Sequence, residues 1–174
     1  MNGIQDLPTG LWILLAALFG LFLFVCWVVR RLQDRRAAAR LTPDKYIIVD
    51  GSNVMHWGGD PSEKVLGRVL EALEGKGLKP IVYFDANVGY KLWDRYTNEN
   101  ATAKKLRLDP RQVFVAPRGV TADEMLLITA TETGLRVVTN DRFRDWSVQF
   151  PRLGEKRFLV KGEWRQGSVM LRGL

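Results

Sequence analysis

The chain has 174 residues, 47% of them hydrophobic, with 26 Lys and Arg against 19 Asp and Glu. This length suits one compact domain with an appendage and argues against a multidomain enzyme. A single cysteine excludes a disulfide framework and a Cys-rich zinc site, and a single histidine argues against His-ligated zinc hydrolases and His-based triads. The net charge of +7 indicates a polyanionic partner or an anionic membrane.

Residues 11–29 form an uncharged apolar run that predicts a transmembrane helix. At about 1.5 Å per residue it would be roughly 28 Å long, close to the hydrocarbon thickness of a bilayer. Trp12 and Trp27 near its ends fit an interfacial aromatic belt. A buried core helix would need more surrounding protein than this chain offers. A cleaved signal peptide is opposed by the length of the run and by the lack of Lys or Arg in the first ten residues.

The arginines that follow the apolar run predict its orientation. They are Arg30, Arg31, Arg35, Arg36 and Arg40, and no Lys or Arg precedes the run. Since positive residues stay on the cytoplasmic side, the N-terminus is expected outside and the remainder in the cytoplasm. The predicted organisation is a non-cytoplasmic N-terminus at 1–10, a transmembrane helix at 11–29, a basic juxtamembrane linker at 30–42 and a soluble domain at 43–174.

The soluble part alternates short apolar runs with helix-like stretches. Continuous β-branched runs stand at residues 46–49, 80–84, 112–115 and 136–139. Such runs predict strands buried on both faces of a parallel sheet, and residues 157–160 and 168–171 predict two further strands at one sheet edge. One helix is predicted to follow the sequence Asp60–Glu63, with Asp60 as its capping acid, and to end near Gly75 or Gly77. Further helices are predicted over 89–108, with an interruption at 97–100, and from Thr121–Glu124 to Gly134. The alternation predicts a doubly wound, mainly parallel α/β domain.

Acidic residues stand where the predicted strands end. Asp50, Asp85 and Asp141 directly follow three strands, and the exit from the fourth leads to Asp123 and Glu124 at a helix start. In an open α/β sheet these carboxylates meet at one edge, which also receives the nearby Asp145. Crowded like charges imply a bound cation, and an oxygen-only set suits Mg²⁺ or Mn²⁺. The chemistry this favours is phosphodiester hydrolysis.

Each acid also has a structural interpretation. Asp50 and Asp141 could close turns, Asp85 could cap the element that follows it, and Glu124 could complete a capping box. Separate caps need not share one edge of the sheet, whereas a metal site must. The expected convergence therefore favours the metal site.

Three motifs in this order resemble the NYN domains of the PIN-like nuclease superfamily, in particular the regnase-like ribonucleases known from CCCH-zinc-finger proteins and their bacterial relatives. They are residues 46–54 with Asp-Gly-Ser-Asn, the acid pair Asp123–Glu124, and residues 138–146 with Thr-Asn-Asp-Arg-Phe-Arg-Asp. The resemblance covers roughly residues 45–146. The chain departs from that branch in having Asp-Glu where it usually has Asp-Asp, and in carrying no CCCH zinc finger.

The resemblance implies a Mg²⁺- or Mn²⁺-dependent ribonuclease, expected to be an endonuclease. The implied catalytic residues are Asp50, Asn53, Asp123 and Asp141; the implied metal ligands are Asp50, Asp123, Glu124 and Asp141; Asp85 and Asp145 are expected in the outer shell. The asparagine is expected to support the first acid.

Basic and aromatic residues near these motifs are candidates for RNA contact. Arg142, Arg144, Lys91, Lys104 and Lys105 could bind phosphates, and Tyr90, Trp93 and Tyr96 could stack on unpaired bases. The alternative is that the cations solvate helix surfaces and the aromatic side chains belong to the core. His56, the single histidine, is assigned no role.

The sequence thus predicts a membrane-anchored ribonuclease acting on single-stranded RNA, placed in a bacterial inner membrane with its catalytic domain in the cytoplasm. RNA and the membrane are the expected partners, no small-molecule cofactor is expected, and a homodimer is left open. One alternative is an inactive PIN-like module that binds RNA or protein. Another is a phosphatase or receiver domain, which the lack of Asp-x-Asp after the first strand and of a strand-terminal Lys opposes.

Overall fold

The computed structural model of the protein describes residue 12, residues 15–26 and residues 41–174, in two units divided after residue 40. In the first unit residues 15–26 are helical and exposed, with Phe19 63% accessible. No helix among the described residues is long and apolar enough to cross a membrane. The predicted span at 11–29 lies partly outside the described residues, and the N-terminal residues 1–10 and the arginines of the linker lie wholly outside them.

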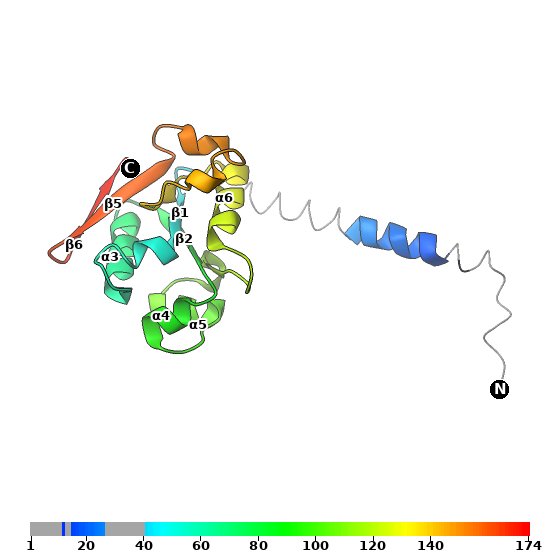
Figure 1. Ribbon diagram of the computed structural model, residues 1–174, viewed down its shortest axis with the longest axis horizontal. Coiled ribbons are helices and arrows are strands. Elements are labelled where there is room, and N and C mark those ends of the chain that lie inside the picture. Colours follow the sequence, from blue (N-terminus) through cyan, green and yellow to red (C-terminus); the bar gives the residue numbers. More distant parts are fainter. Residues whose placement is uncertain (1–11, 13–14, 27–40) are drawn as a thin grey trace. The chain divides into compact units, whose positions relative to one another are not determined.

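The second unit, residues 41–174, is built on one six-stranded sheet (Figure 1). Its strands are β1 (Tyr46–Asp50), β2 (Lys79–Phe84), β3 (Val113–Val115), β4 (Val137–Val138), β5 (Leu159–Arg165) and β6 (Ser168–Arg172). Their spatial order is β3-β2-β1-β4-β5-β6; the first five are parallel to one another and β6 is antiparallel to β5. The predicted mainly parallel α/β sheet is therefore confirmed.

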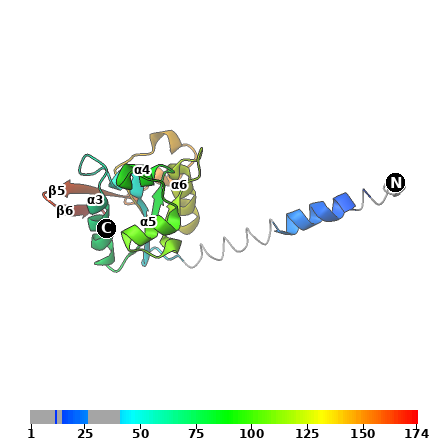
Figure 2. The same cartoon turned by 90° about the horizontal axis from the view of Figure 1, so that it is seen from below.

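Helices cover both faces of this sheet. They are α2 (Gly51–Val54), α3 (Glu63–Glu74), α4 (Val88–Trp93), α5 (Glu99–Leu106) and α6 (Ala122–Thr133), with 3₁₀ turns η1 (Pro110–Gln112), η2 (Arg144–Trp146) and η3 (Pro151–Gly154). Figures 1 and 2 show α3 and α6 on opposite sides of the central strands, and the two hydrophobic clusters agree, since one contains residues of α3, α4 and α5 and the other residues of α6. The predicted stretch at 89–108 is thus two helices, α4 and α5.

Strand β1 illustrates why the central strands are apolar on both sides. Ile47 and Val49 pack into the cluster beneath α3, whereas Ile48 packs into the cluster beneath α6, and all three side chains are fully buried. A strand covered on both faces has no solvent side to place polar residues on, which produces the continuous apolar run seen in the sequence.

Several strand ends differ from the prediction, and β5 in particular is Leu159–Arg165 where residues 157–160 were expected. Gln112 belongs to η1 instead of β3, because its side chain completes a capping box with Asp109 and donates to the Pro80 carbonyl oxygen (2.7 Å). Strand β4 comprises only Val137 and Val138, so Arg136 and Thr139, which flank it, lie outside the assigned strand.

One predicted helix start is also wrong. The N-cap of α3 is Ser62, whose hydroxyl accepts from the Val65 N–H (3.3 Å), instead of Asp60. Ser62 has the extended backbone that a cap requires, and its oxygen reaches the N–H group three residues on. The other predicted signals are confirmed: Gly75 ends α3, Thr121 caps α6, and Gly134 closes α6 with φ +76°.

Candidate active site

The order of the strands reverses between β1 and β4. From β1 the chain builds outward through β2 to β3, and it then returns to place β4 and β5 on the other side of β1. In open α/β sheets the crevice beyond the carboxyl ends of the strands at such a reversal is where ligands bind. Asp50 ends β1 and Asp141 follows β4, so two of the predicted acids stand at this point.

Asp50 is a buried carboxylate with a hydrogen bond to each oxygen. The residue is only 2% exposed to solvent. Its Oδ1 accepts a hydrogen bond from the Asn53 N–H (3.0 Å) and its Oδ2 accepts one from the Thr139 hydroxyl (2.9 Å). Burial raises the pKa of Asp50 to about 7, with smaller contributions in the same direction from Asp123 and Asp85, while the two hydrogen bonds act the other way. The loss of hydration outweighs both hydrogen bonds, so the ionised form of Asp50 is less stable than it would be in water.

Asp123 and Asp141 lie close enough to interact with the other acids. Partial burial, Asp141 and Asp85 raise the pKa of Asp123, in the first turn of α6, to about 6. No described residue donates a hydrogen bond to the Asp123 carboxylate. Asp141 is fixed by its own turn, because its Oδ1 accepts from the Phe143 N–H (2.8 Å) and its N–H donates to the Thr139 hydroxyl (3.0 Å). The structure thus brings four of the predicted acids into one electrostatically connected set, Asp50, Asp85, Asp123 and Asp141.

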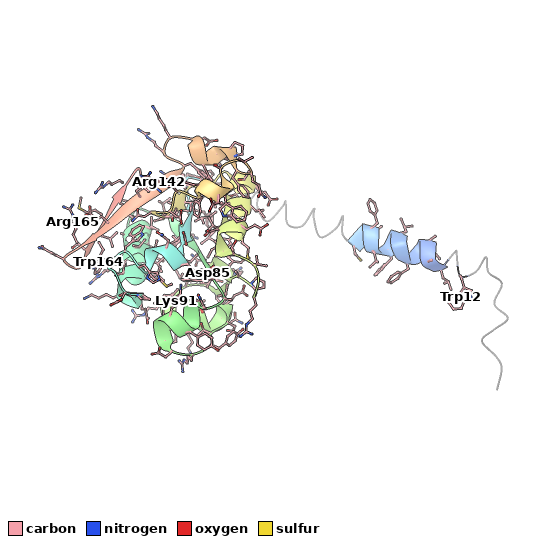
Figure 3. The ribbon with its side chains drawn as sticks, in the orientation of Figure 1. Trp12, Asp85, Lys91, Arg142, Trp164 and Arg165 are labelled. Carbon is pink, nitrogen blue, oxygen red and sulfur yellow. The ribbon has the colours of Figure 1, made fainter. Side chains whose placement is uncertain are left out.

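Asp85 is expected in the outer shell of the site, and its contacts differ from the local cap that was its alternative interpretation. Its Oδ1 accepts from the N–H of Ala122, the first residue of α6 (3.2 Å), instead of capping the segment that follows it. Its own N–H donates to the Ser52 hydroxyl (2.9 Å). Asp85, labelled in Figure 3, therefore connects α2, β2 and the start of α6, and so positions Asp123.

Asn53 supports Asp50 through its backbone, while its side chain joins two distant segments. Asn53 Oδ1 accepts from the indole N–H of Trp57 and from the N–H of Asn140, both at 2.9 Å. The Asn140 amide in turn pairs with the backbone of Gly162, donating to its carbonyl oxygen (2.8 Å) and accepting from its N–H (3.1 Å). The first motif, the last motif and β5 are thus held together by amide groups.

Lys161 on β5 belongs to the site and was not predicted. Its ammonium donates to the backbone carbonyl oxygen of Asp141 (2.7 Å). Burial lowers the pKa of Lys161, and Arg142 acts in the same direction, whereas Asp141 opposes them. The sequence places Lys161 twenty residues beyond Asp141, and only the parallel pairing of β4 with β5 brings the two together.

The other predicted residues near the motifs show no hydrogen bond to the four gathered acids in the described part of the chain. Glu124 donates its N–H to the Thr121 hydroxyl (3.4 Å), which is half of the capping box considered for it. Asp145 and Arg144 are exposed in η2, and Arg142 is exposed next to Asp141. Lys91 is exposed on α4, and Figure 3 shows it well separated from Arg142.

Lys104 is exposed on α5, and the contacts of Lys105 are with α4 and α3. Lys105 lies over the ring of Trp93, with its Nζ 4.7 Å from the ring centroid, and lines a groove with residues of α3. Trp93 also donates its indole N–H to Glu63 on α3 (2.6 Å). Through these contacts Lys105 and Trp93 connect α5, α4 and α3, and neither hydrogen-bonds to the four gathered acids.

The donor set fits a hard divalent cation in its chemistry. The four gathered acids offer carboxylate oxygens, and burial together with the smaller effect of mutual repulsion raises the pKa of Asp50 and of Asp123. No group of three or more His, Cys, Asp or Glu residues in the described part of the chain is arranged so that it could hold a metal ion. Mg²⁺, however, is usually bound by one or two carboxylates together with water and substrate phosphate oxygens.

Comparisons with known proteins bear on this geometry. A search of curated proteins finds no match. Among solved structures, the chain is similar to nuclear proteinaceous RNase P 2 (PRORP2) from Arabidopsis thaliana in two structures, each with 20% sequence identity and a TM-score of 0.60. The first match covers 80% of this chain and 32% of the PRORP2 chain. The second covers 97% of this chain and 37% of the PRORP2 chain, so this chain spans about a third of those proteins. These likenesses support the fold.

The family model of the Zc3h12a-like ribonuclease NYN domain matches residues 43–171. That range contains the first five strands, β6 except for its last residue, and each of the four gathered acids. It also agrees with the resemblance carried by the sequence motifs. The chain therefore belongs to the Zc3h12a-like ribonuclease NYN domain family.

Proposed function

We propose that this protein is a ribonuclease that hydrolyses phosphodiester bonds of single-stranded RNA with the help of Mg²⁺ or Mn²⁺. The observation that carries the proposal is the convergence of Asp50, Asp123 and Asp141 at the strand-order reversal of an NYN domain. Endonucleolytic cleavage is part of the proposal, and the naming of both similar structures as RNase P proteins is consistent with an RNA substrate.

The acids would hold the cation, with Asp50 and Asp123 as the principal ligands and Asp141 beside them. A divalent cation there would stabilise negative charge on the phosphate and lower the pKa of the attacking water. Asp123 suits this role because no described residue donates to its carboxylate. Asp50 suits it because burial makes its charge costly without a counterion.

Thr139 positions these acids relative to each other. Its hydroxyl donates to Asp50 and accepts from the Asp141 N–H, so one oxygen fixes the ends of β1 and of the segment after β4. Lys161 adds a positive charge at the same edge through its bond to the Asp141 carbonyl oxygen. An ammonium there would attract a phosphodiester and partly offset the repulsion that the acids exert on it.

The test is a cleavage assay with the full chain purified in detergent. Unstructured and structured RNAs are incubated with Mg²⁺, with Mn²⁺ or with EDTA, and the products are separated by size. Internal fragments are expected with either metal, none with EDTA, and none from Asp50→Asn. Asp60→Asn, an exposed acid outside the cluster, is the matched control and should cleave normally. Equal cleavage by Asp50→Asn or in EDTA would refute the proposal, and metal-dependent binding without product would favour the inactive module.

Membrane attachment is a separate proposal. We infer that residues 11–29 anchor the protein, because the run is uncharged and the described side chains of residues 15–26 are apolar and exposed, with Gly20 adding no polar group. In the proposed topology the NYN domain faces the cytoplasm of a bacterial cell. Cell fractionation tests it: the protein should stay in the membrane pellet after alkaline washing and enter solution with detergent, and release by alkali alone would contradict it.

A further inference from the structure

A cleft of about 390 Å³ lies beyond the carboxyl ends of β2 and β3. It is lined by Ala86, Tyr90, Tyr96, Asn98, Glu99, Val115, Ala116, Pro117 and Arg118. Ala86 directly follows Asp85, and the segment that leaves the cleft at Arg118 leads within five residues to Asp123. The cleft is therefore a neighbour of the acid cluster at the same edge of the sheet.

Two tyrosines form its exposed wall. Tyr90 is 52% and Tyr96 68% accessible. Single exposed aromatic side chains are ordinary on protein surfaces, but here two of them line one cleft beside an acid site. No described residue hydrogen-bonds to either phenol, so the tyrosines are not held there by partners of their own.

The backbone beneath these tyrosines is tightly packed. Gly89 lies so close to Thr97 that a Cβ at position 89 would come within 2.6 Å of the Thr97 nitrogen. The Arg95 N–H donates to the Gly89 carbonyl oxygen (3.4 Å), and Thr97 is buried, accepting from the Thr102 hydroxyl (2.9 Å). Because residues 89 and 97 are in contact, the backbone segments that carry Tyr90 and Tyr96 lie side by side. Little conformational entropy is therefore lost when both side chains contact one ligand.

Polar groups stand at the other walls. Asn98 caps α5 through its Oδ1 (2.9 Å from the Ala101 nitrogen), and Glu99 Oε1 accepts from the Val115 N–H (3.4 Å). These bonds leave the amide NH₂ of Asn98 and the second carboxylate oxygen of Glu99 for a ligand. Arg118 is exposed in a turn closed by the Val120 N–H to the Pro117 carbonyl oxygen (3.1 Å), with Gly119 at φ +85°.

We infer that this cleft binds one unpaired nucleobase of the RNA strand, close to the nucleotide that is cleaved. The tyrosine rings supply stacking surfaces, the Asn98 and Glu99 side chains supply a donor and an acceptor for the base edge, and Arg118 supplies a cation for the backbone. A duplex keeps its bases stacked inside the helix, so the cleft selects single-stranded RNA. The inference rests on the proposed function for its substrate and adds where the strand is recognised.

The experiment measures binding, so that it is independent of cleavage. The full chain carrying Asp123→Asn, which prevents turnover, is titrated against a fluorescent ten-nucleotide RNA with Mg²⁺ present. A set of RNAs carries one abasic nucleotide at each successive position. One position should weaken binding by roughly tenfold, the size expected for a lost base–aromatic stack, while the others change it little.

The tyrosine variants identify the cleft as the cause. In a protein with Tyr90→Leu and Tyr96→Leu, the intact RNA should bind roughly tenfold more weakly, and the position-specific abasic effect should disappear. Tyr90→Phe with Tyr96→Phe keeps both rings and should retain it. An abasic effect that persists in the leucine variant, or is absent from the parent protein, would overturn the inference, as would equal weakening at every position.

The two proposals fail in different ways. If the wild-type chain cleaves RNA but shows no position-specific abasic effect, the ribonuclease stands and the base-binding cleft is wrong. If the abasic effect is found in a chain that never cleaves, the cleft is supported and the hydrolytic function is wrong. A leucine variant that loses affinity for a partner protein while binding RNA normally would also contradict the cleft as a nucleobase site.

Discussion

The acid cluster between β1 and β4 and the tyrosine cleft beyond β2 and β3 occupy one edge of the same sheet, yet they are built in opposite ways. Asp50 is buried and each of its oxygens accepts a hydrogen bond, whereas Tyr90 and Tyr96 are exposed on a tightly closed loop. The acid cluster holds buried negative charge in a fixed geometry, whereas the tyrosine cleft exposes aromatic rings to solvent.

The difference suggests a division between chemistry and recognition. Fixed carboxylates with raised pKa values suit a step in which charge changes, because they need no rearrangement as it develops. Exposed rings suit a strand whose sequence varies, because every base has a face that can stack. We therefore expect changes at the acid cluster to lower the rate of cleavage and changes at the cleft to weaken RNA binding.

The largest expected effect is on catalysis. Asp123→Asn should lower kcat on the order of a thousandfold, because a cation that stabilises the transition state contributes several kcal/mol and about 1.4 kcal/mol corresponds to tenfold in rate. The double leucine variant at Tyr90 and Tyr96 should instead raise KM with little change in kcat. Steady-state kinetics on one RNA checks both, and a fall in kcat for the tyrosine variant equal to that for Asp123→Asn would remove the distinction between the regions.

Stability without divalent cations should depend on pH through Asp50. Its pKa is about 7 in the folded protein against an ordinary value of 3.8, so between these values the folded state binds the proton more tightly than the unfolded chain. The free energy of unfolding should therefore fall as pH rises from about 4 to about 7, by as much as about 4 kcal/mol, and no further above that. Urea unfolding across this range is the measurement.

Asp50→Asn should remove the larger part of the pH dependence, because the amide does not titrate, and leave a smaller decline from Asp123, whose pKa is raised to about 6. Mg²⁺ added at pH 8 should stabilise the wild-type protein and leave the variant nearly unchanged. If the free energy of unfolding declined with pH identically in both proteins, the Asp50 carboxylate would not be the group responsible. Burial of the charge of Asp50 would then not destabilise the fold.

Gly162→Ala should destabilise the domain by about 3 kcal/mol. An added Cβ would collide with the indole ring of Trp57, and overpacking of this kind typically costs about 1–3 kcal/mol. A fall in Tm of roughly 10 °C is expected by calorimetry. Gly67→Ala, in α3 with open space around it, is the matched control and should raise stability slightly because alanine favours helix. Equal Tm values for both variants would contradict the packing argument.

Asn53→Ala should cost about 2 kcal/mol, since the Trp57 indole and the Asn140 N–H both lose their acceptor in a partly buried position. Cleavage should fall with it, because Asn140 precedes Asp141. Asn53→Asp keeps an acceptor oxygen and should restore most of the stability. Chemical denaturation of the three proteins is the measurement, and a loss in Asn53→Asp as large as that in Asn53→Ala would show that the acceptor is not what matters.

The smallest effect is expected from Arg142→Gln. As an exposed cation beside Asp141, Arg142 should contribute a few-fold to RNA affinity, and its loss should reduce the dependence of log affinity on log salt by about 0.7. Arg68→Gln, on α3 and already paired with Glu71 (2.8 Å), is the control and should leave RNA binding unchanged. Fluorescence titrations at several salt concentrations measure both slopes.

Much of the acid cluster could be predicted because parallel strands end at a common edge. Asp50, Asp123 and Asp141 each follow a recognisable strand or open a helix, so their convergence follows from the fold class alone. Lys161 could not be predicted in this way, because its place beside Asp141 depends on the register of β5 against β4. Nor could the bond from Thr139 to Asp50, which joins residues 89 positions apart.

The errors had a local origin. The sequence around Asp60 contains two polar residues able to cap α3, and backbone geometry selected Ser62. Asp85 lies in a short turn, where a local cap is the simplest expectation, but its oxygen reaches the start of α6 instead. The tyrosine cleft escaped prediction as a unit because the contact between Gly89 and Thr97 leaves no pattern in the sequence.

The hydroxyl of Thr139 limits which positive species can neutralise Asp50. Both carboxylate oxygens already face donors, the hydroxyl at Oδ2 and the Asn53 N–H at Oδ1, and the Asp141 N–H fixes the direction of the hydroxyl by occupying one of its lone pairs. The two hydrogen bonds stabilise the ionised form of Asp50 and so oppose its protonation, although burial outweighs them in the metal-free protein. A cation adds charge without a hydrogen and can use the remaining lone pairs. The arrangement therefore discriminates between two ways of relieving the same buried charge, and it favours the one that leaves the hydrogen-bond network intact.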